Sequence, residues 1–141
     1  MIVFISCAKS KQKSRSMAQD MYISPLFKKQ LAFAKTFNPD KIYILSAKYG
    51  VVELEQYISP YDLTLNDMPN SKRKEWAYKC YLQLKKKNIN FNEKAIFLCG
   101  ENYHKYLSQV FKNAEIPLGD LPFGKRLQYL NQYLKERREN D

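Results

Sequence analysis

The segment 41–65 carries the side chains whose types and spacing are best suited to chemistry. It begins with an apolar run at Ile42–Leu45 and then turns abruptly polar. The polar part contains Ser46, Ala47, Lys48, Tyr49 and Gly50, and further along Pro60, Tyr61 and Asp62. Open α/β folds build their sites where buried strands end in such loops. The segment therefore predicts a site at the end of a strand, without naming its ligand.

Two other apolar runs end in comparable loops. The first loop, 6–11, reads SCAKSK and offers Ser6, Cys7 and Lys9, while the second starts at Gly100 and Glu101. The carboxyl ends of parallel strands share one edge of a sheet, so these loops are expected to face the loop after Leu45. Lysines, small hydroxyls, backbone amides and a carboxylate suit a phosphate-bearing ligand with an aromatic or ribose part.

Asp62 is the principal candidate for a catalytic carboxylate, with Asp20 and Glu101 as the other candidates. A carboxylate next to an aromatic residue in a constrained loop can orient water or stabilise a sugar cation in N-glycosidic chemistry. Each candidate also has a simpler interpretation. Asp62 could cap a turn, as aspartate commonly does. Glu101 stands at a helix start, where a negative charge interacts favourably with the helix dipole.

The binding candidates have structural alternatives as well. The loop 6–11 lacks the P-loop pattern and reads equally as a solvated basic loop. Cys7 has no obvious general base beside it, which favours a small buried residue over a nucleophile. Gly50 reads as a turn glycine at positive φ, and Tyr49 as either packing or a platform for a nucleobase.

Alternating short strands and helices must position these loops. Strands are predicted at Ile2–Ser6, Lys41–Leu45 and Lys94–Cys99, with a short one at Val51–Leu54. Ser24 and Pro25 predict a helix start, and the next helix is expected from an Asn70–Ser71 cap to about Lys86. Further helices are predicted at 101–111 and 125–138, with a turn at 18–22 and a loop at 117–124.

This order predicts a single α/β domain over residues 1–141, with a frayed tail at 136–141. We expect three layers, in which a short, mostly parallel sheet is flanked by helices on both faces. The chain length is near that of one ordinary domain.

The net charge of +10, from 24 basic and 14 acidic residues, favours an anionic partner such as nucleic acid or a nucleotide. The lysine runs 72–74 and 85–87 read either as a nucleic-acid contact or as a solvated helix face. No apolar run approaches the length of a membrane span, and the amino terminus lacks the form of a secretory signal. We therefore expect a cytoplasmic protein without membrane contact.

The cysteines Cys7, Cys80 and Cys99 are odd in number and widely spaced, which fits neither a disulfide framework nor a zinc knuckle. Three reduced, largely buried thiols are expected. The acidic residues show no metal-ligand spacing, so we expect no metal and no cofactor. The sequence does not predict the oligomeric state.

An ordered set of motifs resembles a small bacterial and phage family of unknown function, number 6884, over nearly the whole chain. These motifs read ISCAKSK, DMYISPLFKK, KIYILSAKYGVV, PYDLTL, FLCGENYHKYL and PLGDLPFGKRLQYL. More distantly, the segment 44–65 is similar to the YaaA peroxide-stress proteins. That resemblance implies an α/β protein that binds DNA. The shared motifs add Tyr22 to the binding candidates and retain Ser6, Lys9, Ser46, Lys48, Tyr49, Gly50, Tyr61 and Gly100.

The leading hypothesis is a protein that acts on nucleic acid or a nucleotide and cleaves or exchanges an N-glycosidic bond, as a glycosylase does. In this mechanism Lys9 and Lys48 hold phosphate, Tyr49 or Tyr61 stacks on the base, and Asp62 serves the sugar. Two alternatives remain open at this point. One is a non-catalytic, YaaA-like DNA-binding protein of stress or defence, and the other is a nucleotide-binding sensor.

Overall fold

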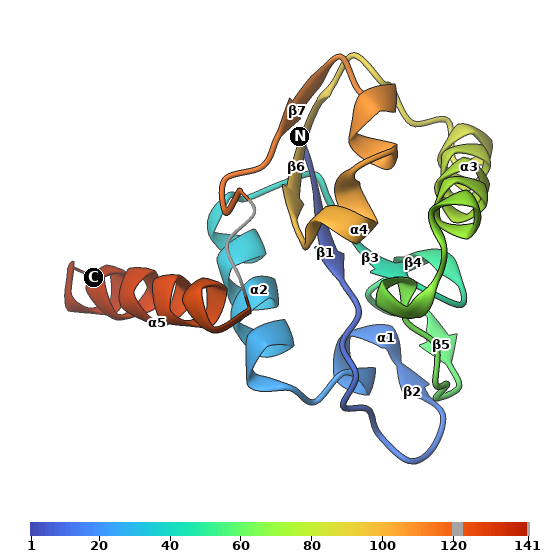
Figure 1. Cartoon of the computed structure of the whole chain (residues 1–141). Coiled ribbons are helices and arrows are strands. Elements are labelled where there is room, and N and C mark those ends of the chain that lie inside the picture. The colour runs from blue at the N-terminus through green and yellow to red at the C-terminus, as the bar shows by residue number, and fades with distance from the viewer. Residues whose placement is uncertain (120–122, 141) are drawn as a thin grey trace.

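A five-stranded sheet forms the middle layer of the computed structural model, which describes residues 1–119 and 123–140 (Figure 1). The strand order is β4-β3-β1-β6-β7, in which only β4 runs antiparallel to its neighbour. A separate antiparallel pair consists of β2 and β5. The strands are β1 (Ile2–Ser6), β2 (Ser16–Met17), β3 (Lys41–Ser46), β4 (Gly50–Glu53), β5 (Tyr57–Ile58), β6 (Lys94–Leu98) and β7 (Asn113–Glu115). The predicted α/β class with a mostly parallel sheet is confirmed.

Helices cover both faces of this sheet, with α3 and α4 on one side and α2 on the other, while α5 packs against α2 and projects away from the sheet (Figure 1). The helix α1 lies with β2 and β5 beyond the carboxyl end of β1. The bounds are α1 (Ala18–Met21), α2 (Pro25–Thr36), η1 (Leu65–Asp67), α3 (Asn70–Lys86), α4 (Glu101–His104), η2 (Leu107–Val110) and α5 (Phe123–Asn140), where η marks a short 3₁₀ helix.

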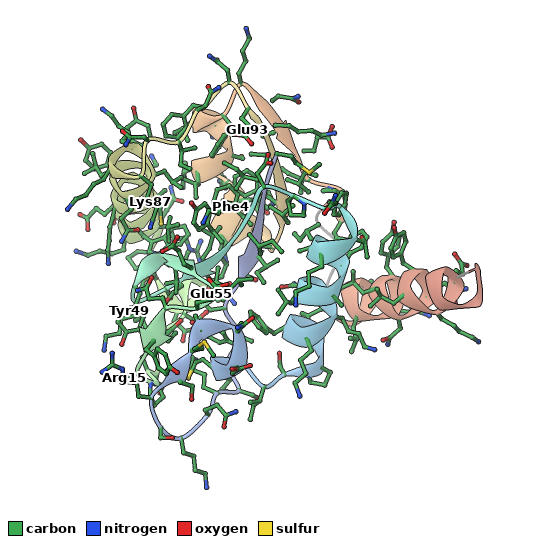
Figure 2. All side chains as sticks on the ribbon, turned by 180° about the vertical axis from the view of Figure 1, so that it is seen from behind. Phe4, Arg15, Tyr49, Glu55, Lys87 and Glu93 are labelled. Atoms are coloured by element: carbon green, nitrogen blue, oxygen red, sulfur yellow. The ribbon has the colours of Figure 1, made fainter. Side chains whose placement is uncertain are left out.

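The central strand β1 is buried throughout and divides its side chains between two cores. Ile2 and Phe4 pack on the α3 side, whereas Val3 and Ile5 pack on the α2 side. Figure 2 shows Phe4 at the centre of the molecule, where its ring stacks on Phe97 of β6 at 4.7 Å between centroids. A strand buried on both faces reads as a continuous apolar run, which explains the pattern of the first residues.

The start of α2 agrees with its prediction, whereas the start of α3 does not. Ser24 Oγ accepts a hydrogen bond from the amide of Phe27 at 3.1 Å, and Pro25 occupies the first helical position. For α3 the capping residue is Pro69, which has no side-chain donor or acceptor. The predicted cap residue Asn70 instead accepts a hydrogen bond from the Tyr106 hydroxyl at 2.6 Å. Tyr106, which is distant in the sequence, therefore binds the Asn70 side chain that the local pattern had assigned to a helix cap.

The region after β6 differs most from its prediction. The expected helix at 101–111 ends at His104, and η2 leads into the edge strand β7, which pairs in parallel with β6. All three residues of β7 are exposed, so the sequence of this strand lacks the alternation of apolar and polar residues that would predict a half-buried strand. The predicted turn at 18–22 contains the short helix α1, and the strand predicted at 51–54 occurs one residue earlier as β4. Part of the predicted loop 117–124 lies outside the described residues.

Gly50 is the glycine on which the link between sheet and helix depends. Its φ is +78°, and a Cβ there would lie 2.2 Å from Oε1 of Gln83 in α3. That oxygen accepts from the Val51 amide at 2.7 Å, and Nε2 of Gln83 donates to the Tyr49 carbonyl at 3.0 Å. Any larger residue would displace the Gln83 amide from both partners.

We predict that Gly50→Ala lowers the free energy of unfolding by about 3–4 kcal/mol. This sums about 1–2 kcal/mol for the left-handed backbone and about 1 kcal/mol for each hydrogen bond of Gln83. Urea denaturation would measure it. Gly119→Ala is the matched control, because Gly119 also has positive φ, at +55°, but has no atom within 4 Å of a Cβ. Equal losses in both variants would show that the contact with Gln83 contributes nothing.

Candidate functional site

The carboxyl ends of β1, β3 and β6 lie at one edge of the sheet, because these strands are parallel. The loop after β1 and the loop after β3 start side by side, as the Cys7 amide donates to the Leu45 carbonyl at 3.0 Å. The segment 59–64 joins these loops through Tyr61. The predicted neighbourhood of three strand-end loops is therefore present, and we call it the carboxyl edge.

Ser46, the last residue of β3, is the centre of a hydrogen-bond network at this edge. It is fully buried, and its hydroxyl donates to the Tyr61 hydroxyl at 2.8 Å. Its Oγ also accepts from the amides of Lys48 at 3.3 Å and Tyr49 at 3.0 Å. The hydroxyls of Tyr61 and Tyr22 are 2.7 Å apart. The network joins the end of β3, the segment 59–64 and the residue that follows α1.

Helix α3 supports the same loop from the other side. The indole N–H of Trp76 donates to the Ser46 carbonyl at 2.9 Å, and Lys79 Nζ donates to the Lys48 carbonyl at 2.9 Å. Trp76 is buried, so it is a core residue with a polar function. The loop 46–50 is thus fixed at both its side-chain and its backbone groups.

A second contact joins the first and third strand-end loops. Cys7 Sγ lies 3.4 Å from the Tyr103 hydroxyl, which also accepts from the Leu65 amide at 3.4 Å. The ring of Tyr103 meets Trp76 edge to face at 5.6 Å between centroids. Tyr103 belongs to the predicted third loop, but it was not singled out as a site residue. Its place four residues after Cys99, in the third loop, was the available signal.

Lys11 belongs to the predicted loop 6–11, although it was not singled out as a site residue. Its Nζ lies 4.5 Å from the centroid of the Tyr61 ring and donates to the Lys9 carbonyl at 3.2 Å. Partial burial lowers the pKa of Lys11, while the charges of Cys7 and Asp62 oppose that shift. The ammonium group is therefore held over an aromatic ring, with Asp62 near enough to act on it.

Burial raises the pKa of the phenols of Tyr22, Tyr61 and Tyr103 well above the usual value, and the proximity of Cys7 adds to the rise. All three phenols consequently stay protonated at neutral pH. They act as neutral hydrogen-bonding groups and are unsuited to act as bases.

The three predicted carboxylates, Asp62, Asp20 and Glu101, are all exposed. Asp62 follows the anchored Tyr61 and influences Lys11 electrostatically, which places it at the carboxyl edge. Asp20 and Glu101 lie in the first turns of α1 and α4. A catalytic role remains a prediction for each of them, and Asp62 is the one that directly follows a residue of the Ser46 network.

The remaining predicted residues divide into accessible and structural ones. Lys9 and Lys48 are exposed, with Lys48 Nζ 5.3 Å from the centroid of the half-buried Tyr49 ring. Figure 2 shows Tyr49 on the same side of the molecule as Lys87, the residue that follows α3. Ser6 is buried at the end of β1, and Gly100 precedes α4 and accepts from the amides of Tyr103 and His104.

In the part of the chain that the structure describes, no group of three or more His, Cys, Asp or Glu side chains could hold a metal ion. No helix in the same residues is long and apolar enough to cross a membrane. Cys7, Cys80 and Cys99 are thiols, and the last two are buried.

Because the folded protein keeps protons on its buried phenols, we predict that stability falls as the pH rises above about 10. The unfolded chain releases these protons, so each such tyrosine removes about 1.4 kcal/mol per pH unit. Tyr103→Phe should reduce the slope by that amount between about pH 10 and 11.5. Urea unfolding at several pH values measures this slope. The exposed Tyr78 provides the control Tyr78→Phe, and a Tyr103→Phe slope equal to that of the wild type would contradict the account.

Comparison with known proteins gives a family and no activity. Neither the curated proteins nor the solved structures contain a match to this chain. A family described as "Family of unknown function (DUF6884)" matches residues 2–132, which include every residue of the site described above. The chain therefore belongs to this family of unknown function.

Proposed function

We propose that the carboxyl edge binds a nucleotide, or a nucleotide unit of nucleic acid, and cleaves or exchanges its N-glycosidic bond. The observation that carries this proposal is the convergence of Lys11, Tyr61 and Asp62. The Lys11 ammonium group lies 4.5 Å above the Tyr61 ring and is influenced by Asp62. A cation, an aromatic surface and a carboxylate are the groups that a phosphorylated sugar with a base would need.

Phosphate would be held by lysines of the first two strand-end loops. Lys9 and Lys48 are exposed on these loops, and Lys11 of the first loop lies over the Tyr61 ring. Charge-assisted hydrogen bonds from ammonium groups to phosphate oxygens are stronger than neutral ones. The net charge of +10 would also favour the approach of an anionic ligand.

Asp62 would act at the sugar. As the bond from the anomeric carbon to the base nitrogen breaks, positive charge develops on the sugar, and a nearby carboxylate stabilises it. A water molecule oriented by Asp62 then forms the new bond to that carbon. One proton of the water passes to the carboxylate, and the base leaves with its bonding electron pair and takes up a proton.

We assign different roles to the two tyrosines that the sequence offered for base stacking. Lys11 covers one face of Tyr61, and the Tyr61 hydroxyl is engaged by Ser46 and Tyr22. Tyr61 is therefore assigned to positioning Asp62 and Lys11. Tyr49 also has a lysine beside its ring, but Lys48 Nζ is more distant, at 5.3 Å from the centroid, and is exposed. A phosphate could draw this lysine away, so the half-buried Tyr49 is the candidate for stacking on the base.

A second candidate function is binding of a nucleotide or DNA without turnover. The exposure of Asp62 favours it, because a carboxylate open to solvent is less strongly tuned than one in a closed site. The resemblance of the segment 44–65 to the DNA-binding YaaA proteins also favours binding without turnover.

The cysteines are thiols, which is typical of a reducing compartment, so the cytoplasm of a bacterial or phage-infected cell is the proposed location.

The test is release of free base from single-stranded DNA, duplex DNA, RNA and nucleotides, followed by chromatography. Asp62→Asn should reduce the rate by about 100-fold or more, as expected for loss of a general base. Asp67→Asn is the matched control, since Asp67 is an exposed aspartate of the neighbouring η1. Equal rates for wild type and Asp62→Asn would remove Asp62 from the mechanism. Absence of release from every substrate, together with nucleotide binding that Lys11→Gln abolishes, would favour the second candidate.

A further inference from the structure

The outer face of α3 combines exposed rings with lysines, and the carboxyl edge does not account for it. Tyr78 and Leu82 are large side chains that remain 62% and 45% exposed. Trp76, Cys80 and Leu84 take the opposite, buried side of the same helix. The buried side of the helix anchors it in the core, so packing of the core does not require Tyr78 and Leu82 to be large and apolar.

Lysines flank Tyr78 and Leu82 on both sides. Helical spacing places Lys74 and Lys85 along one side and Lys72, Lys79 and Lys86 along the other. The single acidic residue of α3 is Glu75, which pairs with Lys72 at 3.3 Å. We call the surface formed by Lys72, Lys74, Tyr78, Lys79, Tyr81, Leu82, Lys85 and Lys86 the basic α3 face.

The aromatic part of this face is already arranged beside cations. The rings of Tyr78 and Tyr81 lie 6.3 Å apart between centroids, at 38° to each other. Lys85 Nζ lies 5.4 Å from the centroid of Tyr81. Rings interleaved with ammonium groups are the elements from which single-stranded nucleic-acid sites are built, because bases stack on the rings while phosphates meet the cations.

We propose that the basic α3 face binds single-stranded nucleic acid, with phosphates along the lysines and a base stacked on Tyr78. The inference rests on the proposed function and narrows its substrate from nucleotides and nucleic acid in general to single-stranded nucleic acid. The face is connected to the carboxyl edge, since Lys79 donates to the Lys48 carbonyl at 2.9 Å. A strand held along α3 would thus lead toward the loop 46–50.

The chemistry of the face favours a single strand over other anionic partners. In a duplex the bases are stacked inside, so the exposed ring of Tyr78 would find no base to stack on. An acidic membrane would be bound by a continuous apolar face, whereas the apolar side of α3 is buried in the core. Phosphodiesters supply closely spaced negative charges that match two rows of lysines.

Fluorescence anisotropy with a labelled 20-nucleotide oligothymidylate, titrated at several salt concentrations, tests the proposal. The triple variant Lys74→Gln/Lys85→Gln/Lys86→Gln should lower the slope of log K against log salt concentration by about 2, at about 0.7 per phosphate contact. Tyr78→Ala should weaken binding by about 5-fold or more, and Tyr78→Phe should retain it, because stacking needs the ring alone.

The matched control is Lys28→Gln/Lys35→Gln/Lys112→Gln, which removes the same charge from exposed lysines elsewhere. Equal salt slopes in the two triple variants would overturn the proposal. Binding of duplex, or of phosphatidylserine vesicles, as tight as that of the single strand would also overturn it. Strand binding by Asp62→Asn without base release by any form would show that only the proposed function fails. Asp62-dependent base release from nucleotides without strand binding would show that only this inference fails.

Discussion

The hydrogen bonds of the buried Ser46 side chain are the constraint on which the carboxyl edge depends. A hydroxyl removed from water must find partners within the protein, and Ser46 finds them in Tyr61 and in the amides of Lys48 and Tyr49. Its carbonyl is satisfied by Trp76 of α3. One residue at the end of one strand thus fixes a loop, a crossing segment and a helix.

This hydrogen-bond network determines where the charged side chains of the carboxyl edge lie. Because Tyr61 is held by Ser46 and Tyr22, its ring offers a fixed surface for Lys11, and Asp62 follows it on the exposed side. The buried phenols remain neutral, so the charged groups at the edge are the lysines and the carboxylate. The structure thereby separates positioning residues, which are buried hydroxyls, from the accessible groups that would meet a ligand.

The sequence predicted local features well and tertiary ones poorly. The apolar run Ile2–Ser6 and the Ser24–Pro25 helix start depend on neighbouring residues, and both occur as predicted. The capping role of Asn70 failed because Tyr106, far along the chain, takes its side chain. Strand β7 was missed because its three exposed residues show no alternation. The grouping of loops, which contain Lys11 and Tyr103, was predicted from parallel strands. The contacts of Lys11 with Tyr61 and of Tyr103 with Cys7 join distant segments, and no local pattern encodes them.

The most direct measurement is an NMR titration of the ¹⁵N-labelled protein with a mixture of the four deoxynucleoside 5′-monophosphates. If the carboxyl edge binds nucleotides, the amide signals of Lys9, Lys11, Lys48, Tyr49 and Asp62 should shift, and these shifts should be lost in Lys11→Gln. Amide signals of the carboxyl edge that stay unshifted at millimolar nucleotide, or that shift equally in Lys11→Gln, would contradict the assignment of this edge as a nucleotide site.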